Sequence, residues 1–205
     1  MVSGPVLRRS SMILRTAVVF PLLTISLTSC GTAAAKRDTF DLTARASVEG
    51  PSARNRQILI PTPTALKALN SEQIVVRTSP SEIQYLSRAQ WSDSLPRLMQ
   101  SRLVEAFENS GKFGGVGMPG QGLAIDYQIV TDIRSFEIVS AGTRSAVVEI
   151  SAKILNDRNG TVRAQNVFRK SVPVAAAQNE AFVRALDSAA AQVTGEIVDW
   201  TLRAL

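Results

Sequence analysis

Residues 123–172 read LAIDYQIVTDIRSFEIVSAGTRSAVVEISAKILNDRNGTVRAQNVFRKSV, and this stretch decides the fold. Apolar residues alternate with polar or small ones in three successive segments, which is the pattern of half-buried strands. The segments run from Leu123 to Ile133, from Ala146 to Ile154 and from Val162 to Val172. Just after the first segment the alternation changes phase at Phe136, which predicts a bulge or bend. The three segments predict an antiparallel meander.

Three shorter strands are predicted upstream of the meander, because short runs of Ile, Val, Leu and Tyr are bounded by prolines. They are Ile58–Ile60, Gln73–Arg77 and Ile83–Leu86.

Two segments carry apolar residues at spacings of three and four, the pattern of an amphipathic helix. The first begins near Ser92 or Asp93, tolerates Pro96 in its first turn and stops at Gly111. The second begins at about Asn179. About six strands and two helices predict an α+β, two-layer sandwich, with a mixed or antiparallel sheet and both helices packed on one face.

The N-terminal residues are typical of a secretory signal peptide, with basic residues, an apolar run and then small residues. The apolar run from Thr16 to Ser29 contains Pro21 and is shorter than the ~20 residues of a membrane-spanning helix. We therefore expect residues 1–29 to be a removable leader, with either Met1 or Met12 as the true start.

Residues 27–30, LTSC, resemble the lipobox of bacterial lipoproteins. The resemblance implies cleavage after Ser29 and attachment of acyl chains such as palmitate to Cys30, the only cysteine. The alternative is an ordinary secreted protein with a free thiol. Gly31 stands where an aspartate would signal inner-membrane retention, so we expect the periplasmic side of the outer membrane. Residues 30–56 would then form the lipidated N-terminus and a flexible tether of about 25–30 Å, and residues 57–205 the folded domain.

Composition excludes several function classes. The chain has 23 basic and 17 acidic residues, but three arginines precede Cys30, which leaves 20 basic residues and a net charge of +3. The remaining charge forms no basic run, which argues against nucleic-acid binding. Histidine is absent, so no Ser-His-Asp triad can form and zinc loses its usual nitrogen ligand. We expect no enzyme activity, no cofactor and no metal site.

Candidate binding residues are few. The glycine-rich segment Gly111–Gly122 lacks the residue order of a phosphate loop, which favours a flexible connection that could act as a mobile contact loop. Glu105 and Glu108 are expected on a solvated helix face. Tyr85, Trp91 and Phe113 are among only 11 aromatic residues and are candidates for a partner or ligand groove, although core packing is the default for such residues.

Residues 61–111 resemble the ABC-type transport auxiliary lipoproteins, the family that includes the paraquat-inducible protein C group. The resemblance lies in order and spacing: a strand ended by Pro61, Leu66 and Leu69 in a loop, the I-V-x-R strand Ile74–Arg77, a short strand ending near Tyr85, and Trp91 opening a helix.

The resemblance implies a periplasmic docking or structural subunit, without chemistry of its own, of an ABC transporter. Its partners would be a protein with MCE-type domains and the permease and ATPase complex, which move phospholipids or other hydrophobic molecules between the inner and outer membranes. The alternative is a carrier that itself binds a lipid or small molecule in an apolar cavity. A homo-oligomer is compatible with either function.

Overall fold

The predicted meander forms the centre of the sheet. In the computed structural model, which describes residues 1, 2, 4 and 36–205, strands β7 (Tyr127–Val139), β8 (Ser145–Asn156) and β9 (Val162–Pro173) pair antiparallel in chain order. Alternate residues of β8 from Ala146 to Ile154 are completely buried, so the predicted meander is confirmed. Strand β7 begins four residues later than expected, and Leu123 is exposed.

The phase change near Phe136 is a β-bulge. The register of β7 against β8 shifts between Ile133 and Ser135. Ile133 lies opposite Ile150 before the shift, and Phe136 lies opposite Val148 after it. All four apolar side chains are buried, because the extra residue returns the later part of β7 to the core face.

The second edge of β7 accepts three parallel strands in succession. These are β2 (Ala53–Leu59), β3 (Thr64–Ala65) and β4 (Gln73–Ser79). Strand β6 (Phe113–Gly117) adds to β2 in parallel, β5 (Glu82–Trp91) pairs antiparallel with β4, and β1 (Asp38–Phe40) pairs in parallel with β5. The described residues thus form one mixed sheet of nine strands, three more than expected.

Part of the glycine-rich segment is a strand, so the flexible connection predicted there is wrong for Phe113–Gly117. A Cβ atom on Gly114 would lie 2.3 Å from the carbonyl oxygen of Arg54 in β2. The absence of a side chain therefore lets the two strands approach each other. Gly111 does end the preceding helix, with a φ of 62°.

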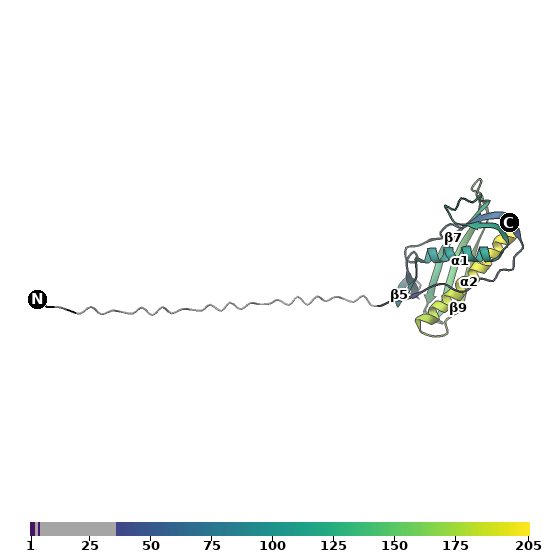
Figure 1. The fold of residues 1–205 in the computed structure, drawn as a ribbon. Coiled ribbons are helices and arrows are strands. Elements are labelled where there is room, and N and C mark those ends of the chain that lie inside the picture. The colour runs from purple at the N-terminus through teal and green to yellow at the C-terminus, as the bar shows by residue number, and fades with distance from the viewer. Residues whose placement is uncertain (3, 5–35) are drawn as a thin grey trace. The chain divides into compact units, whose positions relative to one another are not determined.

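Both helices cover the same face of the sheet (Figure 1). Helix α1 (Leu95–Asn109) and helix α2 (Asn179–Ala204) begin within three residues of their predicted starts. Between them and the sheet lies the core, whose completely buried members include Met99, Leu103, Phe107, Leu186, Val193 and Ile197. The predicted α+β sandwich with both helices on one face is therefore confirmed.

The folded domain begins well before residue 57. Ala35–Leu205 form one compact unit, and β1 already pairs with β5 at Asp38. Leu42 is 1% exposed within the core. The tether predicted for residues 30–56 is therefore wrong from Asp38 onward. Cys30 and all of the predicted leader except residues 1, 2 and 4 lie outside the described residues.

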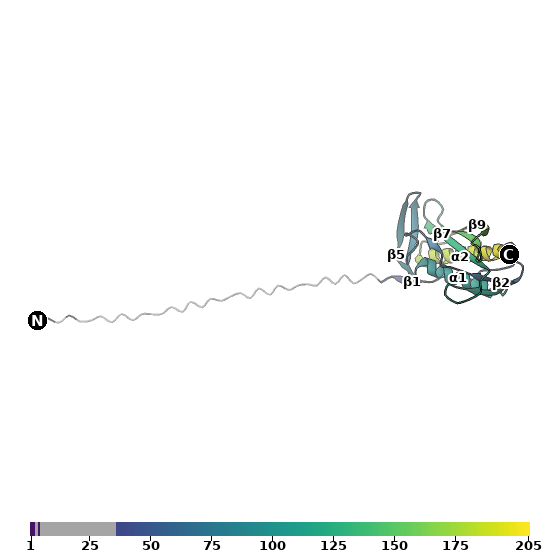
Figure 2. The same ribbon diagram turned by 90° about the horizontal axis from the view of Figure 1, so that it is seen from above.

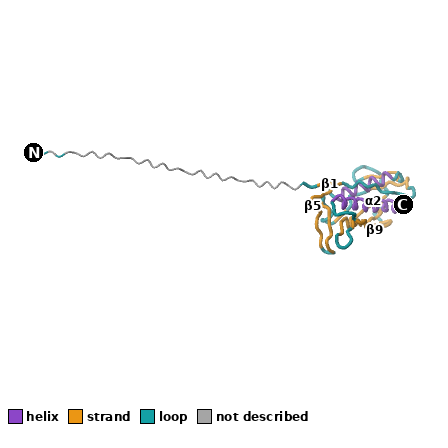
Figure 3. Tube along the Cα trace, turned by 90° about the horizontal axis from the view of Figure 1, so that it is seen from below, coloured by secondary structure: helices purple, strands orange, loops and turns teal. Residues whose placement is uncertain are grey.

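Strands β4 and β5 form a hairpin that extends away from the helices (Figures 2 and 3). Close to the turn of the hairpin, an ion pair joins β4 to β7: Arg77 Nε and Nη2 donate to the two carboxylate oxygens of Glu137 over 2.7 and 2.9 Å. The Glu137 side chain is 7% exposed and that of Arg77 is 34% exposed. The hydrogen bond to Glu137 raises the pKa of Arg77 above its ordinary value, against an opposing effect of burial, so Arg77 stays charged throughout the physiological pH range.

We expect Arg77→Gln to lower the free energy of unfolding by about 2 kcal/mol, because Glu137 would keep a buried carboxylate without a cationic partner. The partial exposure of Arg77 keeps the loss below the cost of breaking a fully buried pair. The matched control is Arg169→Gln, which removes a 2.7 Å pair with Glu149 whose arginine is 56% exposed and should cost less than about 1 kcal/mol. Urea denaturation measures both, and equal losses would contradict the assignment.

Candidate functional site

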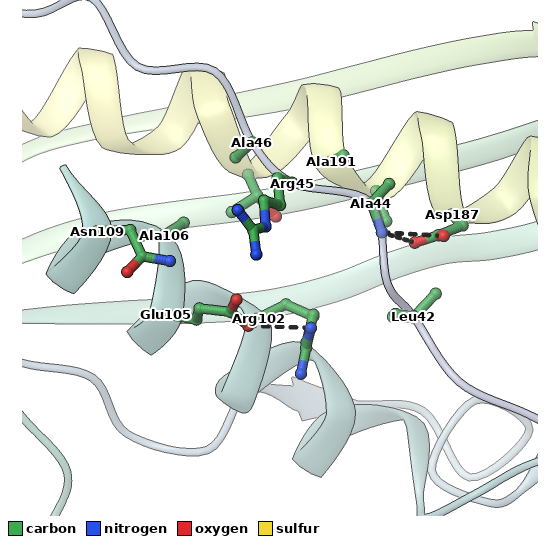
Figure 4. A pocket seen from close by; sticks show the side chains of 12 residues that line it. Leu42, Ala44, Arg45, Ala46, Arg102, Glu105, Ala106, Asn109, Asp187 and Ala191 are labelled. Carbon is green, nitrogen blue, oxygen red and sulfur yellow. Dashed lines mark hydrogen bonds and ion pairs between the residues drawn. The ribbon is translucent and has the colours of Figure 1, made fainter.

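Residues 41–50, here called the strap, run along helix α2 without forming a helix or strand (Figure 4). The strap passes close to the helix at Gly195, where an added Cβ atom would lie 2.5 Å from the carbonyl oxygen of Ser47. Gly50 is equally close to α2, since its added Cβ would lie 2.9 Å from the side chain of Leu202. Small residues on both sides therefore permit this contact.

Two aspartates of α2 hold the strap by its backbone. Asp187 accepts hydrogen bonds from the amides of Thr43 and Ala44 over 2.9 and 3.0 Å, and from the Thr43 hydroxyl over 3.0 Å. Asp199 accepts from the amides of Glu49 and Gly50 over 2.8 and 2.7 Å. Hydrogen bonds to a charged acceptor are stronger than neutral ones, so both ends of the strap are attached to the helix.

A pocket of about 340 Å³ lies between the strap, α1 and α2 (Figure 4). It is lined by Leu42, Ala44, Arg45, Ala46, Arg102, Glu105, Ala106, Asn109, Asp187, Ala190, Ala191 and Thr194. We call it the strap pocket. Five alanines and a leucine give it apolar walls, and most of its polar groups are charged.

Two residues that line the strap pocket each have a buried polar atom without a hydrogen-bond partner among the described residues. Arg102 pairs through Nη1 with Glu105 over 2.9 Å, while its buried Nε has no hydrogen-bond partner in the part of the chain that the structure describes. The hydroxyl of Thr194, a residue that is 2% exposed, likewise lacks a partner among residues 36–205. Arg45 points from the strap toward α1 and makes no ion pair with any described residue.

The structure places the three predicted aromatic residues in different environments. Trp91 is 1% exposed and packs edge-to-face against Phe136, with ring centroids 5.7 Å apart. Phe113 is half-buried and packs against Phe107 at 5.4 Å. Tyr85 is 42% exposed on β5. Trp91 is therefore a core residue. Of the three, only Tyr85 is exposed enough to contact a partner.

Sequence reasoning missed the strap, although two signals were present. Phe40 and Leu42 alternate with polar residues, as expected for a segment with one buried face. Gly195 interrupts a helical pattern, and an isolated glycine in a helix often has a packing reason. The pocket itself has no sequence signal, because its residues come from three separated segments.

Neither a metal centre nor a membrane-spanning segment is found in the described ranges. No group of three or more acidic or cysteine side chains there is arranged to hold a metal ion. Neither of their two helices combines the length and the apolar character needed to cross a bilayer.

Comparison with known families agrees with this fold. A family model described as the ABC-type transport auxiliary lipoprotein component matches residues 40–198. The chain belongs to this family. The matched region of this auxiliary lipoprotein includes the whole strap, so the strap is part of the family's domain. The family is one of transport components of the cell envelope and is not a known enzyme family.

Individual proteins resemble this chain in sequence or in fold. The chain is 32% identical over 180 residues to the uncharacterized protein bll6063 of Bradyrhizobium diazoefficiens, covering 85% of this chain and 47% of that protein. The chain thus spans about half the length of this curated relative. The crystal structure of XCC0632 from Xanthomonas campestris, assigned to family DUF330, superposes with a TM-score of 0.75 at 29% identity, over 82% of this chain and 96% of that one. A second crystal structure, of an uncharacterized protein, has a TM-score of 0.65 at 16% identity, over 81% of this chain and 99% of that one.

We expect Asp187→Ala to release the strap, because the mutation removes the acceptor for two amides and a hydroxyl. Trypsin should then cleave after the exposed Arg45 about tenfold faster, since cleavage follows the population of the open form. Mass spectrometry of the products over time measures the rate at this bond. Glu196→Ala is the control, because Glu196 is also an acid of α2 but pairs with Lys170 of β9. Unchanged cleavage in Asp187→Ala would contradict the role of Asp187.

Proposed function

We propose that this auxiliary lipoprotein is a membrane-anchored docking subunit of an ABC transport system whose partner protein carries MCE-type domains. The system would move phospholipids or other hydrophobic molecules between the inner and outer membranes. Family membership supports the transport role. The observation that carries the docking role is the strap. This segment follows the proposed anchor in the chain and is hydrogen-bonded to α2 at both Asp187 and Asp199.

The proposed anchor is Cys30, acylated after removal of residues 1–29. Seven residues lie between it and Asp38, where β1 begins, and the eight Cα–Cα steps reach at most about 25–30 Å when fully extended. Two or more acyl chains hold a protein stably in a bilayer. A domain held this close presents its surfaces to partners within a short distance of the membrane. Gly31 favours the outer membrane.

The proposed docking surface is the projecting β4–β5 hairpin. Strand β5 pairs with β1 only at Ala89–Trp91, so the edge of Glu82–Arg88 has no second strand beside it in the described sheet. Ile83 and Tyr85 on this segment are 37% and 42% exposed. An open strand edge with exposed apolar side chains suits the addition of a strand from a partner.

The alternative function, a carrier with its own cavity, has one observation in its favour, which is the strap pocket. Its volume of about 340 Å³ lies at the small end of the ~300–1,000 Å³ of typical ligand pockets. It is too small to enclose both acyl chains of a phospholipid. The docking role therefore fits the structure better.

Replacing Cys30 tests the anchor. We expect the wild-type protein to fractionate with the outer membrane and Cys30→Ser to lose membrane attachment, because only a thiol can carry the thioether-linked lipid. The wild-type sulfur should also resist maleimide after denaturation, and the intact mass should include the acyl chains. A bare, maleimide-reactive thiol in the native protein would contradict the proposal, and recovery in the inner membrane would contradict the location.

Replacing Ile83 and Tyr85 together by serine tests the docking surface. We expect co-purification of the MCE-domain protein after crosslinking in native membranes to fall about tenfold, since loss of a few interface anchors removes most of the binding energy. Val162 and Val167 on β9 are similarly exposed, at 52% and 43%, and their replacement by serine is the control.

The outcomes of this experiment separate the two claims. If the wild-type protein captures no component of an ABC transporter, the proposed function is wrong. If the hairpin variant captures as much partner as the control does, the hairpin is not the docking surface.

A further inference from the structure

We propose that the turn Leu66–Asn70 contacts the phospholipid bilayer to which the chain is anchored, with Leu66 entering the interface and Lys67 at the lipid phosphates. The inference rests on the proposed anchor at Cys30. It is independent of the docking hairpin, because the turn shares no residue with β4 or β5.

Leu66 is the most exposed large apolar residue of the domain that residues 36–205 form. It is 76% exposed, and the next such residue, Val162, is 52% exposed. The turn that carries Leu66 is well defined, because the amides of Leu69 and Asn70 both donate to the Leu66 carbonyl oxygen, over 2.8 and 2.9 Å. Leu69 is buried in the core. The fold therefore holds Leu66 in solvent, where a single apolar side chain is available to a partner.

Backbone hydrogen bonds place the turn beside β1, where the chain enters the domain. Directly after the turn, the carbonyl oxygen of Ser71 accepts from the amide of Leu95, the first residue of α1, over 3.1 Å. The carbonyl oxygen of Glu72 accepts from the amide of Trp91 over 2.7 Å. Trp91 lies opposite Phe40 of β1. The turn, the start of α1 and β1 thus lie at one end of the domain.

The proposed anchor keeps this end of the domain near the bilayer. Cys30 lies at most about 25–30 Å from Asp38 along an extended chain. Helix α2 has 26 residues and is about 40 Å long. Its first residue, Asn179, donates to the carbonyl oxygen of Ser87 in β5, close to β1, and Ala204 in its last turn accepts from Arg163 in β9. The end of the domain that contains Val162 and Arg163 is therefore remote from the anchor.

Leu66 and Lys67 match the two layers of a bilayer interface. Burial of a leucine side chain strengthens a contact about tenfold. Lys67 is exposed and makes no ion pair within residues 36–205, and a long cationic side chain can keep its ammonium group among phosphates beside an inserted neighbour. The exposed acids Asp38 and Glu72 offset basic residues at this end, so the attraction is local to the turn.

The anchor also favours lipid over a protein as the occupant. A tether of this length gives the bilayer surface an effective concentration on the order of millimolar. A contact that is weak by itself is then formed much of the time. The bilayer is always within reach, whereas a protein partner has to arrive.

A fluorescent probe at position 66 tests the contact. The acylated protein is reconstituted into vesicles of phosphatidylethanolamine and phosphatidylglycerol, with an environment-sensitive dye attached to Leu66→Cys. Acylation of Cys30 leaves the introduced thiol as the one that reacts. The control is Val162→Cys, at the other end of the domain. We expect lipids with spin-labelled acyl chains to quench the dye at position 66 and to leave the dye at position 162 bright. Equal quenching at the two positions would overturn the proposal.

Lys67→Gln tests the phosphate contact in the same labelled protein. We expect the ratio of membrane-contacting to free domains to fall about fivefold, measured from the quenched fraction of the dye. Lys153→Gln is the control, because it removes the same charge from an exposed position on β8. Equal falls would mean that only net charge matters, which would overturn the role of Lys67.

The anchor and the contact fail in different ways. If the protein does not sediment with the vesicles, the proposed anchor is wrong and the contact with it. If it sediments but the dye at position 66 stays bright, the anchor stands and the contact is wrong. Protection of the dye that appears only when the MCE-domain protein is added would assign Leu66 to a protein interface and overturn the lipid contact.

Discussion

The pairing of β7 with β8 is the constraint on which the rest of the structure depends. Twelve residues of β7 lie opposite β8, so β7 is held along its whole length on one edge. Its other edge can then accept β2, β3 and β4, each in contact with β7 through only two or three residue pairs. Pairing over so few residues is not stable alone. The bulge after Ile133 keeps both halves of β7 on the core face, without which the helices would have no continuous surface to cover.

Helix α2 has two different partners on its two sides. Its apolar face, with Leu186, Val193 and Ile197 completely buried, packs against the sheet. On the opposite side Asp187 and Asp199 bind the strap. A force applied to the N-terminal chain would therefore reach the longest helix of the domain directly. The strap connects the proposed membrane anchor to the rigid part of the fold.

The two candidate functional surfaces differ in chemistry as well as in place. The β4–β5 hairpin offers an open backbone edge with Ile83 and Tyr85, which suits a protein partner. The strap pocket has apolar walls of alanine and leucine beside two arginines and two acids. Because the strap forms one wall of the pocket, a ligand there would add contacts between the anchor-proximal chain and both helices. Ligand binding would thereby stabilise the docked strap.

The sequence by itself determined the elements whose residues repeat with a regular period. The meander, its bulge and both helices could be predicted because alternation in Ala146–Ile154 and the apolar stripe of α2 each report local geometry. The family could also be recognised from the order of Ile74–Arg77, Tyr85 and Trp91. Strands β1, β3 and β6, the strap and the pocket were decided only by tertiary structure. Strands of two to five residues have too few side chains to show a period. Thr43 and Asp187 lie 144 positions apart, so their contact depends on how the whole chain folds.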